Sequence, residues 1–269
     1  MLDVQEFLTG RGVTESPRWH DGRLWFADWG THQVLAASPD GTVEAIADGP
    51  ETPFCLDHTP DGKLLVITGP AVVRHDPAPV RHADLSAYSA PNDIAVDGRG
   101  NAYIGDVAFE FPMGEFVPGS IALVTPDGAV RRVADGMAFP NGMVVTPDGT
   151  TLIVAESFAN RLTAFDIDAD GSLSNRRVWA DLGDGVPDGI CLDADGAVWF
   201  ADVPNKQCVR VREGGEVLER ITLAQGCFAC ALGGNTLYLL TGDMPRGPFG
   251  DEPRTGRILT ATAPSPGVA

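Results

Sequence analysis

The sequence predicts an all-β fold, a six-bladed β-propeller with four antiparallel strands in each blade. Three observations support this prediction: a turn-plus-strand unit occurs six times, the repeat is about 40 residues long, and no long amphipathic helical pattern separates the units. A repeat of that length is typical of propeller blades. Parallel strands would need helical crossovers between them, so the sheet must close by repetition instead.

Each unit begins with a tight turn and continues into a strand rich in β-branched, aromatic and aliphatic residues. Asp-Gly and Gly-Asn turns predict hairpins, because these residues tolerate the positive φ that tight hairpins require. The units start at positions 21, 61, 99, 148, 195 and 233, with spacings of 40, 38, 49, 47 and 38 residues. Shorter strands follow most units, for example 33–37 and 43–47, so each repeat supplies four strands.

The chain length of 269 residues suits one large domain, and its 32 glycines and 21 prolines are spread along the sequence rather than gathered in a linker. We therefore expect a single propeller domain over residues 1–269. Residues 4–9 have strand character and precede the first hairpin, while residues 257–263 follow the last. We expect these two ends of the chain to complete the last blade together.

The formal net charge of −18 argues against nucleic acid and anionic membranes as partners, because both would be repelled. The first ten residues contain Asp3 and Glu6 and no apolar run of signal-peptide length, which argues against secretion and membrane spanning. Five cysteines, an odd number, suit reduced thiols better than a disulfide framework. We expect a cytoplasmic protein whose partner is a small molecule, and the sequence leaves its oligomeric state open.

Repeat register locates a candidate site, because the loop that enters each innermost strand of a propeller reaches the central axis. Seven residues before the turn of repeats two to six stand Phe54, Asn92, Asn141, Asp188 and Gly226. The first four of these positions follow a proline, which fixes the direction of the chain before the strand. In the first repeat, Glu15 lies six residues before its turn.

The predicted axial ring therefore contains two carboxylates and two carboxamides, Glu15, Asp188, Asn92 and Asn141. Buried without partners these groups would be costly, but together they form an oxygen cage for a hard divalent cation. A zinc site of nitrogen and sulfur ligands fits less well, because no His or Cys pair shares this register. The competing interpretation is that Asn and Asp beside Pro and Gly merely form turns. Their shared position in the repeat favours a site.

The segments that contain these residues resemble the SMP-30/regucalcin, gluconolactonase and luciferin-regenerating enzyme family, and the similarity runs nearly end to end. The segments are Glu15-Ser-Pro-Arg-Trp19, Pro91-Asn-Asp-Ile-Ala-Val-Asp97, Phe139-Pro-Asn-Gly-Met-Val-Val145 and Pro187-Asp-Gly-Ile-Cys-Leu-Asp193. The resemblance implies one divalent ion, calcium in the first place and otherwise zinc, manganese or magnesium, held by Glu15, Asn141 and Asp188. It also implies that Asn92 contacts the substrate or a water on the metal, and that Asp93 supports the site.

One position departs from the family pattern. Members that act on sugar lactones often carry an Arg two residues before the third-blade Asn, and this sequence has Ala90 there. The departure argues against a sugar lactone. We expect Phe54 and Phe109 to contact a less polar substrate, together with other apolar residues of the insertion at 107–120. The alternative is that this loop packs on its own small cluster.

The expected function is hydrolysis of a small lactone or related ester, a carboxylic ester hydrolase activity. The ion would polarise the carbonyl and activate water, and Asp188, or alternatively Glu15, would accept a proton, with Asn92 and Asp93 completing the catalytic set. A serine triad is disfavoured, because Gly-x-Ser-x-Gly is missing and all five histidines lie in the first third of the chain. Two alternatives stay open: non-hydrolytic biosynthetic chemistry in the same metal pocket, and a non-catalytic calcium-binding or interaction propeller.

Overall fold

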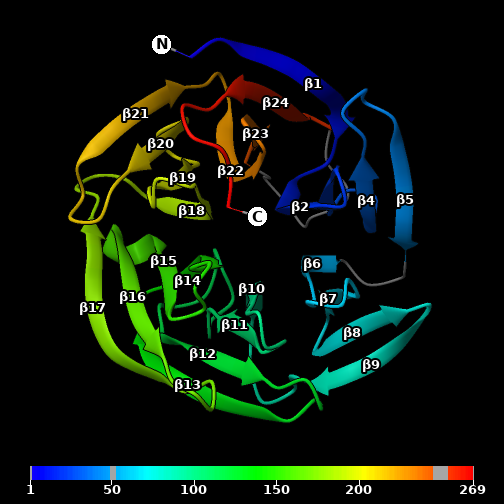
Figure 1. The fold of residues 1–269 in the computed structure, drawn as a ribbon, viewed down its shortest axis with the longest axis vertical. Coiled ribbons are helices and arrows are strands. Elements are labelled where there is room, and N and C mark those ends of the chain that lie inside the picture. The colour runs from blue at the N-terminus through cyan, green and yellow to red at the C-terminus, as the bar shows by residue number, and fades with distance from the viewer. Residues whose placement is uncertain (1, 49–52, 245–253, 269) are drawn as a thin grey trace.

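The computed structural model describes residues 2–48, 53–244 and 254–268, with the side chains of residues 53 and 54 excepted. In these ranges 24 strands form six four-stranded antiparallel sheets, which stand around a common axis like blades (Figure 1). The short η1 (Ser157–Ala159) is a single 3₁₀ turn. The six-bladed propeller predicted from the repeats is confirmed.

The blades follow one another along the chain, and each of the first five runs from its innermost to its outermost strand. Blade 1 contains β2 (Thr14–His20), β3 (Arg23–Asp28), β4 (Gln33–Ala37) and β5 (Val43–Asp48). Blade 2 contains β6 (Pro53–His58), β7 (Leu64–Thr68), β8 (Ala71–Asp76) and β9 (Ala78–Asp84). Blade 3 contains β10 (Pro91–Val96), β11 (Ala102–Asp106), β12 (Gly119–Val124) and β13 (Val130–Met137).

The second half of the ring repeats this plan, except that the last blade is assembled from both ends of the chain. Blade 4 contains β14 (Pro140–Val145), β15 (Thr151–Glu156), β16 (Arg161–Ile167) and β17 (Leu173–Asp181). Blade 5 contains β18 (Pro187–Leu192), β19 (Val198–Asp202), β20 (Gln207–Val211) and β21 (Val217–Thr222). Blade 6 contains β22 (Gly226–Gly233), β23 (Thr236–Gly242), β24 (Gly256–Thr262) and β1 (Val4–Arg11).

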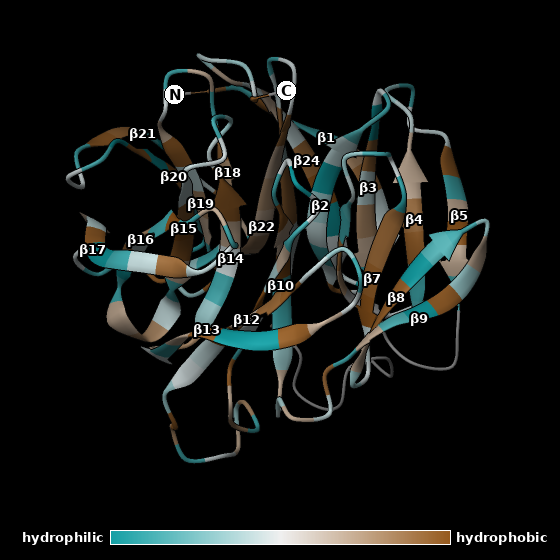
Figure 2. Cartoon of the chain, turned by 60° about the horizontal axis from the view of Figure 1, so that its bottom comes forward, coloured by the Kyte–Doolittle hydropathy of each residue, from teal (hydrophilic) through white to brown (hydrophobic). Residues whose placement is uncertain are grey.

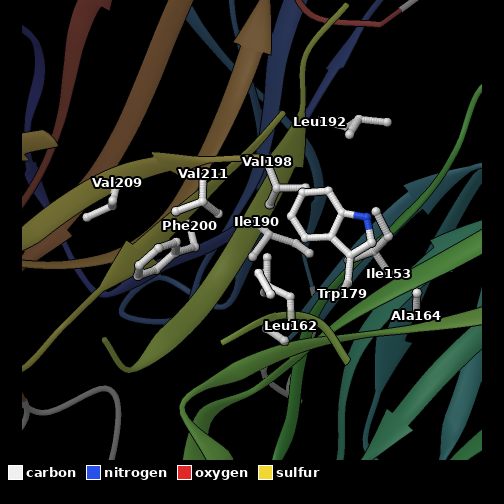
Figure 3. Close-up of a cluster of buried hydrophobic side chains, with 12 residues drawn as sticks. Ile153, Leu162, Ala164, Trp179, Ile190, Leu192, Val198, Phe200, Val209 and Val211 are labelled. Carbon is white, nitrogen blue, oxygen red and sulfur yellow. The ribbon is translucent and has the colours of Figure 1, made fainter. Parts of the chain in front are cut away.

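The hydrophobic core lies between neighbouring blades. Inner strands such as β7 are almost wholly buried, whereas the outermost β9 and β13 are mostly exposed or half-buried and carry hydrophilic stretches (Figure 2). Figure 3 shows one interblade cluster, in which Ile153 and Trp179 of blade 4 face Ile190 and Val198 of blade 5. Burial of both sheet faces explains why the inner strands read as continuous apolar runs.

Four of the five free thiols belong to the core between blades 5 and 6. The Sγ atoms of Cys191 in β18 and Cys230 in β22 are 3.7 Å apart, and Cys208 and Cys227 pack in the same apolar cluster. Burial raises the pKa of the Cys191, Cys208 and Cys227 thiols. No helix in the described part of the chain is both long and apolar enough to cross a membrane.

The ring closes through the antiparallel pairing of β1 with β24. Leu8 of β1 lies opposite Ile258 of β24, and both side chains are buried with Phe26 in a cluster shared by blades 6 and 1. Without β1, the backbone groups along one edge of β24 would lose their hydrogen-bond partners. The amino-terminal strand therefore covers an edge and supplies apolar contacts at once.

Truncating Leu8 tests how far β1 stabilises the ring. We expect Leu8→Ala to lower the free energy of unfolding by about 2–3 kcal/mol, because it removes a buried side chain and leaves a cavity. In a chain of this size that corresponds to a fall in Tm of about 4–10 °C. The matched control is Thr9→Ala in the same strand, whose side chain is exposed. Equal Tm values for the two variants would contradict a stabilising role for β1.

The stacked imidazoles of His20 and His58 tie blade 1 to blade 2. The ring centroids lie 3.9 Å apart, and the ring of Trp25 meets the His58 ring edge-on. Burial, together with neighbouring His20 and Arg18, lowers the pKa of His58 from 6.5 to about 3. The folded protein therefore keeps His58 neutral at pH values where the unfolded chain would protonate it.

This difference predicts a pH-dependent contribution to stability. Because the folded pKa is lower than the unfolded one, the contribution is complete above pH 6.5 and is lost as the pH falls toward about 3. We expect the free energy of unfolding of His58→Phe to fall less steeply between pH 6.5 and 4.5 than that of the parent chain. Urea unfolding at a series of pH values measures both slopes, and parallel curves would contradict the assignment.

Candidate active site at one end of the axis

Four polar side chains meet where the innermost strands begin. Glu15, Asn92, Asn141 and Asp188 are the second residues of β2, β10, β14 and β18, and all four line one cavity of about 790 Å³. We call these four residues the axial cluster. The structure thus brings together every polar residue that repeat register placed on the axis.

A bulge at the same point of each strand explains this convergence. The pairing of the innermost strand with its neighbour shifts between Glu15 and Arg18, and between the proline and the residue three positions later in β10, β14 and β18. A β-bulge turns side chains out of the regular alternation of a strand. The Pro-Asn and Pro-Asp pairs therefore mark positions where a strand directs a polar group toward the axis.

A chain of hydrogen bonds joins blades 3, 4 and 5 at the axial cluster. Asn92 Nδ2 donates to Asn141 Oδ1 at 3.1 Å, and Asn141 Nδ2 donates to Ser157 Oγ at 3.2 Å. Ser157 Oγ in turn donates to the carbonyl oxygen of Pro187 at 2.6 Å. Sequence reasoning missed Ser157, because it follows β15 in a 3₁₀ turn and has no counterpart in the repeat register.

The two carboxylates of the axial cluster share a poorly solvated space. Burial raises the pKa of Glu15 well above its ordinary value, and the negative charge of Asp188 adds to the effect. Burial also raises the pKa of Asp188, and a hydrogen bond with Asn141 acts in the opposite direction. A positive charge beside the two groups would favour their ionised forms.

Arg18 brings a positive charge near Glu15, whose pKa it acts to lower, but its ion pairs are with other carboxylates. Its Nε lies 3.5 Å from Asp57 Oδ1, one terminal nitrogen lies 3.4 Å from Asp93 Oδ1, and the same nitrogen donates to the carbonyl oxygen of Ile94. Asp93 Oδ2 also accepts the backbone N–H of Met143 at 2.9 Å. Asp93 therefore supports the site from behind, by fixing β14 against β10. Sequence reasoning did not identify Arg18 or Asp57.

Glycines let the inner strands approach closely beside the axial cluster. A Cβ atom added at Gly142 would lie 2.6 Å from the carbonyl oxygen of Asp188, and one at Gly189 would lie 2.6 Å from the Cβ of Ala229. Both distances are far shorter than van der Waals contact. Backbone from blade 4 therefore lies directly against backbone from blade 5, and backbone from blade 5 lies against blade 6.

The remaining site residues named from the sequence lie as follows. Phe54 belongs to β6, but its side chain is outside the described part of the structure. Phe109 is buried, lines the axial cavity and packs with Val107, Phe139 and Ala90. His20 stacks on His58 instead of lining this cavity.

Five phenylalanine rings pack together beside the axial cluster, and four of them line its two cavities; we call the five rings the phenylalanine wall. The ring centroids of contacting pairs lie 4.9 to 6.4 Å apart, for example 4.9 Å between Phe139 and Phe158 and 5.2 Å between Phe111 and Phe139. The wall consists of Phe109, Phe111, Phe116, Phe139 and Phe158. A second cavity of about 1130 Å³ shares Phe111, Phe139, Asn141 and Asp188 with the first.

The donor atoms of the axial cluster suit a hard cation. Among the described residues no three His, Cys, Asp or Glu side chains are grouped to hold a metal ion, so a metal here must take amide as well as carboxylate oxygens. Glu15, Asp188 and Asn141 supply such oxygens. Burial raises the pKa of both carboxylates, and a cation bound between them would favour their ionised forms. Calcium accepts this ligand set, whereas zinc prefers nitrogen and sulfur.

The fold and the axial cluster together define a six-bladed propeller with an acidic oxygen-lined site at one end of its axis. The family model described as "SMP-30/Gluconolactonase/LRE-like region" matches residues 13–242, and the chain belongs to that family. A regucalcin from Danio rerio is 30% identical over 148 residues, which are 53% of this chain and 50% of that protein. The chain thus matches about half the length of this curated relative.

Solved structures of similar proteins share the fold over almost the whole chain. A luciferin-regenerating enzyme has a TM-score of 0.85 at 20% identity, covering 100% of this chain and 98% of its own. A calcium-binding protein, regucalcin, from Agrobacterium tumefaciens has a TM-score of 0.83 at 20% identity, covering 99% and 96%. A gluconolactonase from Xanthomonas campestris has a TM-score of 0.79 at 24% identity, covering 98% and 90%.

Adding one methyl group at Gly142 tests the close approach of blades 4 and 5. We expect Gly142→Ala to destabilise the fold by about 1–3 kcal/mol, because its Cβ would overlap backbone atoms of β18. The matched control is Gly98→Ala, at an exposed position where a Cβ meets nothing within 4 Å. Urea unfolding of both variants measures the difference. A Gly142→Ala variant as stable as the control would contradict the packing described above.

Proposed function

We propose that this protein is a metal-dependent hydrolase of a small lactone or related ester. The observation that carries the proposal is the axial cluster: two carboxylates with raised pKa values and two carboxamides meet at one end of an otherwise largely apolar cavity. Glu15, Asn141 and Asp188 would hold the ion. Calcium is the ion we propose first, with zinc, manganese and magnesium as alternatives.

When bound, a divalent ion supplies a Lewis acid for the carbonyl oxygen and lowers the pKa of water. The chain's own groups do the rest. Asp188 would accept the proton of the attacking water, and Asn92 would contact the substrate oxygens that carry developing charge. Water adds to the acyl carbon, the ring C–O bond breaks, the alcohol oxygen gains a proton, and a hydroxy acid leaves.

The surrounding residues hold these groups in place. Ser157 orients the amide of Asn141, and Asp93 with Arg18 fixes the neighbouring strands. The apolar wall limits solvent and strengthens the electrostatic interactions inside the cavity. Preorganisation of this kind is what a catalytic site requires of its supporting residues.

The names of similar proteins support the proposal at a coarser level. One solved neighbour is called a gluconolactonase and another a calcium-binding protein. Family membership suggests a lactonase activity. We propose a small neutral molecule as partner, because the net charge of −18 disfavours nucleic acid and anionic membranes.

The decisive experiment combines metal exchange with acid release. Protein stripped with chelator is reloaded with calcium, zinc, manganese or magnesium, and acid release from a lactone panel is followed at constant pH. We expect activity only with metal, and a loss of about 100-fold or more in kcat for Asp188→Asn, which removes the proton acceptor. Asn141→Ala should weaken metal binding in calorimetry.

The control variant is Asp184→Asn, which changes an exposed carboxylate four residues before Asp188. It should retain parental activity and metal affinity. If metal binds and raises the Tm but no lactone or ester is hydrolysed, the hydrolase assignment is wrong. The same pocket would then serve non-hydrolytic chemistry or calcium binding alone.

A further inference from the structure

We propose that the phenylalanine wall binds an aromatic group of the substrate, so that this site takes neutral aryl lactones or esters rather than polyhydroxylated ones. The inference deepens the function proposed above and rests on it. It assigns a binding role to rings from the long connection between β11 and β12 of blade 3 and from the segments before β14 and after β15 of blade 4. Four observations support it: position, ring exposure, backbone conformation and charge.

The wall adjoins the axial cluster directly. Phe139 lies two residues before Asn141, and Phe158 follows Ser157, the serine that binds Asn141. Phe111 and Phe139 line both cavities, and so do Asn141 and Asp188. A substrate whose carbonyl lies at the axial cluster would therefore place its adjoining ring against these side chains.

The wall combines two buried phenylalanine side chains with three that are about half-exposed. Phe109 and Phe139 are only 8% and 9% exposed, whereas Phe111, Phe116 and Phe158 remain 46%, 49% and 48% exposed. Several half-exposed aromatic side chains next to a polar site are typical of ligand binding. Rings already arranged edge to face offer both faces and edges to a further aromatic ring.

The backbone at Phe139 is held in an unfavourable conformation. Its φ is 62°, in the left-handed region that bulky residues avoid. Two hydrogen bonds maintain it, from Ser157 N–H to the carbonyl oxygen of Phe139 and from Phe158 N–H to that of Ala138, both at 3.1 Å. Such strain is found at sites where the position of a side chain matters for function. Here it places Phe139 between the wall and the axial cluster.

The charges around the wall disfavour an anionic ligand, and its rings offer no strong hydrogen-bond partners to hydroxyl groups. Of the described residues that line the axial cavity, Arg18 is the only basic one, and it is ion-paired with Asp57 and Asp93. The second cavity has exposed Lys206 with acidic Asp188 and Asp243. Glu110 lies in the wall segment and would repel an anion. Ala90 packs against Phe109 and Phe139 and donates no side-chain hydrogen bond. A hydroxyl group buried against Ala90 and these rings would lack a side-chain partner there, which is costly.

Three lactones and one lactam separate this inference from the hydrolase assignment. Dihydrocoumarin carries a fused benzene ring, δ-valerolactone has the same lactone ring without it, and D-glucono-δ-lactone carries hydroxyl groups. We expect kcat/KM to be highest for dihydrocoumarin. Binding of its lactam analogue, 3,4-dihydroquinolin-2-one, is measured by calorimetry and requires no turnover.

Substitutions in the wall complete the test. We expect Phe158→Ala to lower kcat/KM for dihydrocoumarin and affinity for the lactam by about tenfold, while δ-valerolactone changes less than twofold. Phe158→Leu keeps the apolar volume and should fold normally, yet lose part of the preference. Val217→Ala, equally exposed at 48% but on the outermost strand of blade 5, is the control and should change neither substrate.

The outcomes are distinguishable. Lactam binding that depends on Phe158, without hydrolysis of any lactone, would leave the aromatic subsite standing and refute the hydrolase. Hydrolysis that prefers D-glucono-δ-lactone, or that is equally affected for all substrates by Phe158→Ala, would overturn the aromatic subsite. A lactam that binds the parent and Phe158→Ala equally would overturn it as well.

Discussion

Closure of the ring by β1 and β24 is the contact on which the remaining structure depends. Glu15 comes from blade 1 and Asp188 from blade 5, and blade 6 stands between them, with β22 against both β2 and β18. Blade 6 exists as a four-stranded sheet only because β1 joins it. The two blades that carry these carboxylates are therefore joined through a blade that β1 completes.

The sequence predicted the parts of the site that follow the repeat. Asn92, Asn141 and Asp188 share one position in blades 3, 4 and 5. Glu15 lies one residue nearer to the turn of blade 1, so repeat register placed all four on the axis. Residues outside the register were missed. Ser157 follows β15 and binds Asn141 of β14. Arg18 of blade 1 forms ion pairs with Asp57 of blade 2 and Asp93 of blade 3. Such contacts depend on how blades pack, and periodicity along one chain carries no information about them.

The sequence likewise predicted some of the aromatic residues of the site and missed others. Their abundance between β11 and β12 indicated an apolar surface, and Phe109 does line the cavity. Phe139 and Phe158 of blade 4 were not expected to join it, because each looks like an ordinary residue beside a strand. Sequence reasoning also left open whether the loop packs on itself. The structure shows both aspects at once, a buried base of two rings and three rings left half-exposed.

The axial cluster sits on strand starts, whereas most of the phenylalanine wall sits on connections. Strand starts are constrained on every side by neighbouring blades, as the close backbone contacts of Gly142 and Gly189 show. Connections at the rim tolerate insertion and exchange far better. The loop between β11 and β12 can therefore change in length and sequence while the axial cluster keeps its geometry. Ligand preference can then diverge among proteins of this fold without a change in the polar residues on the axis.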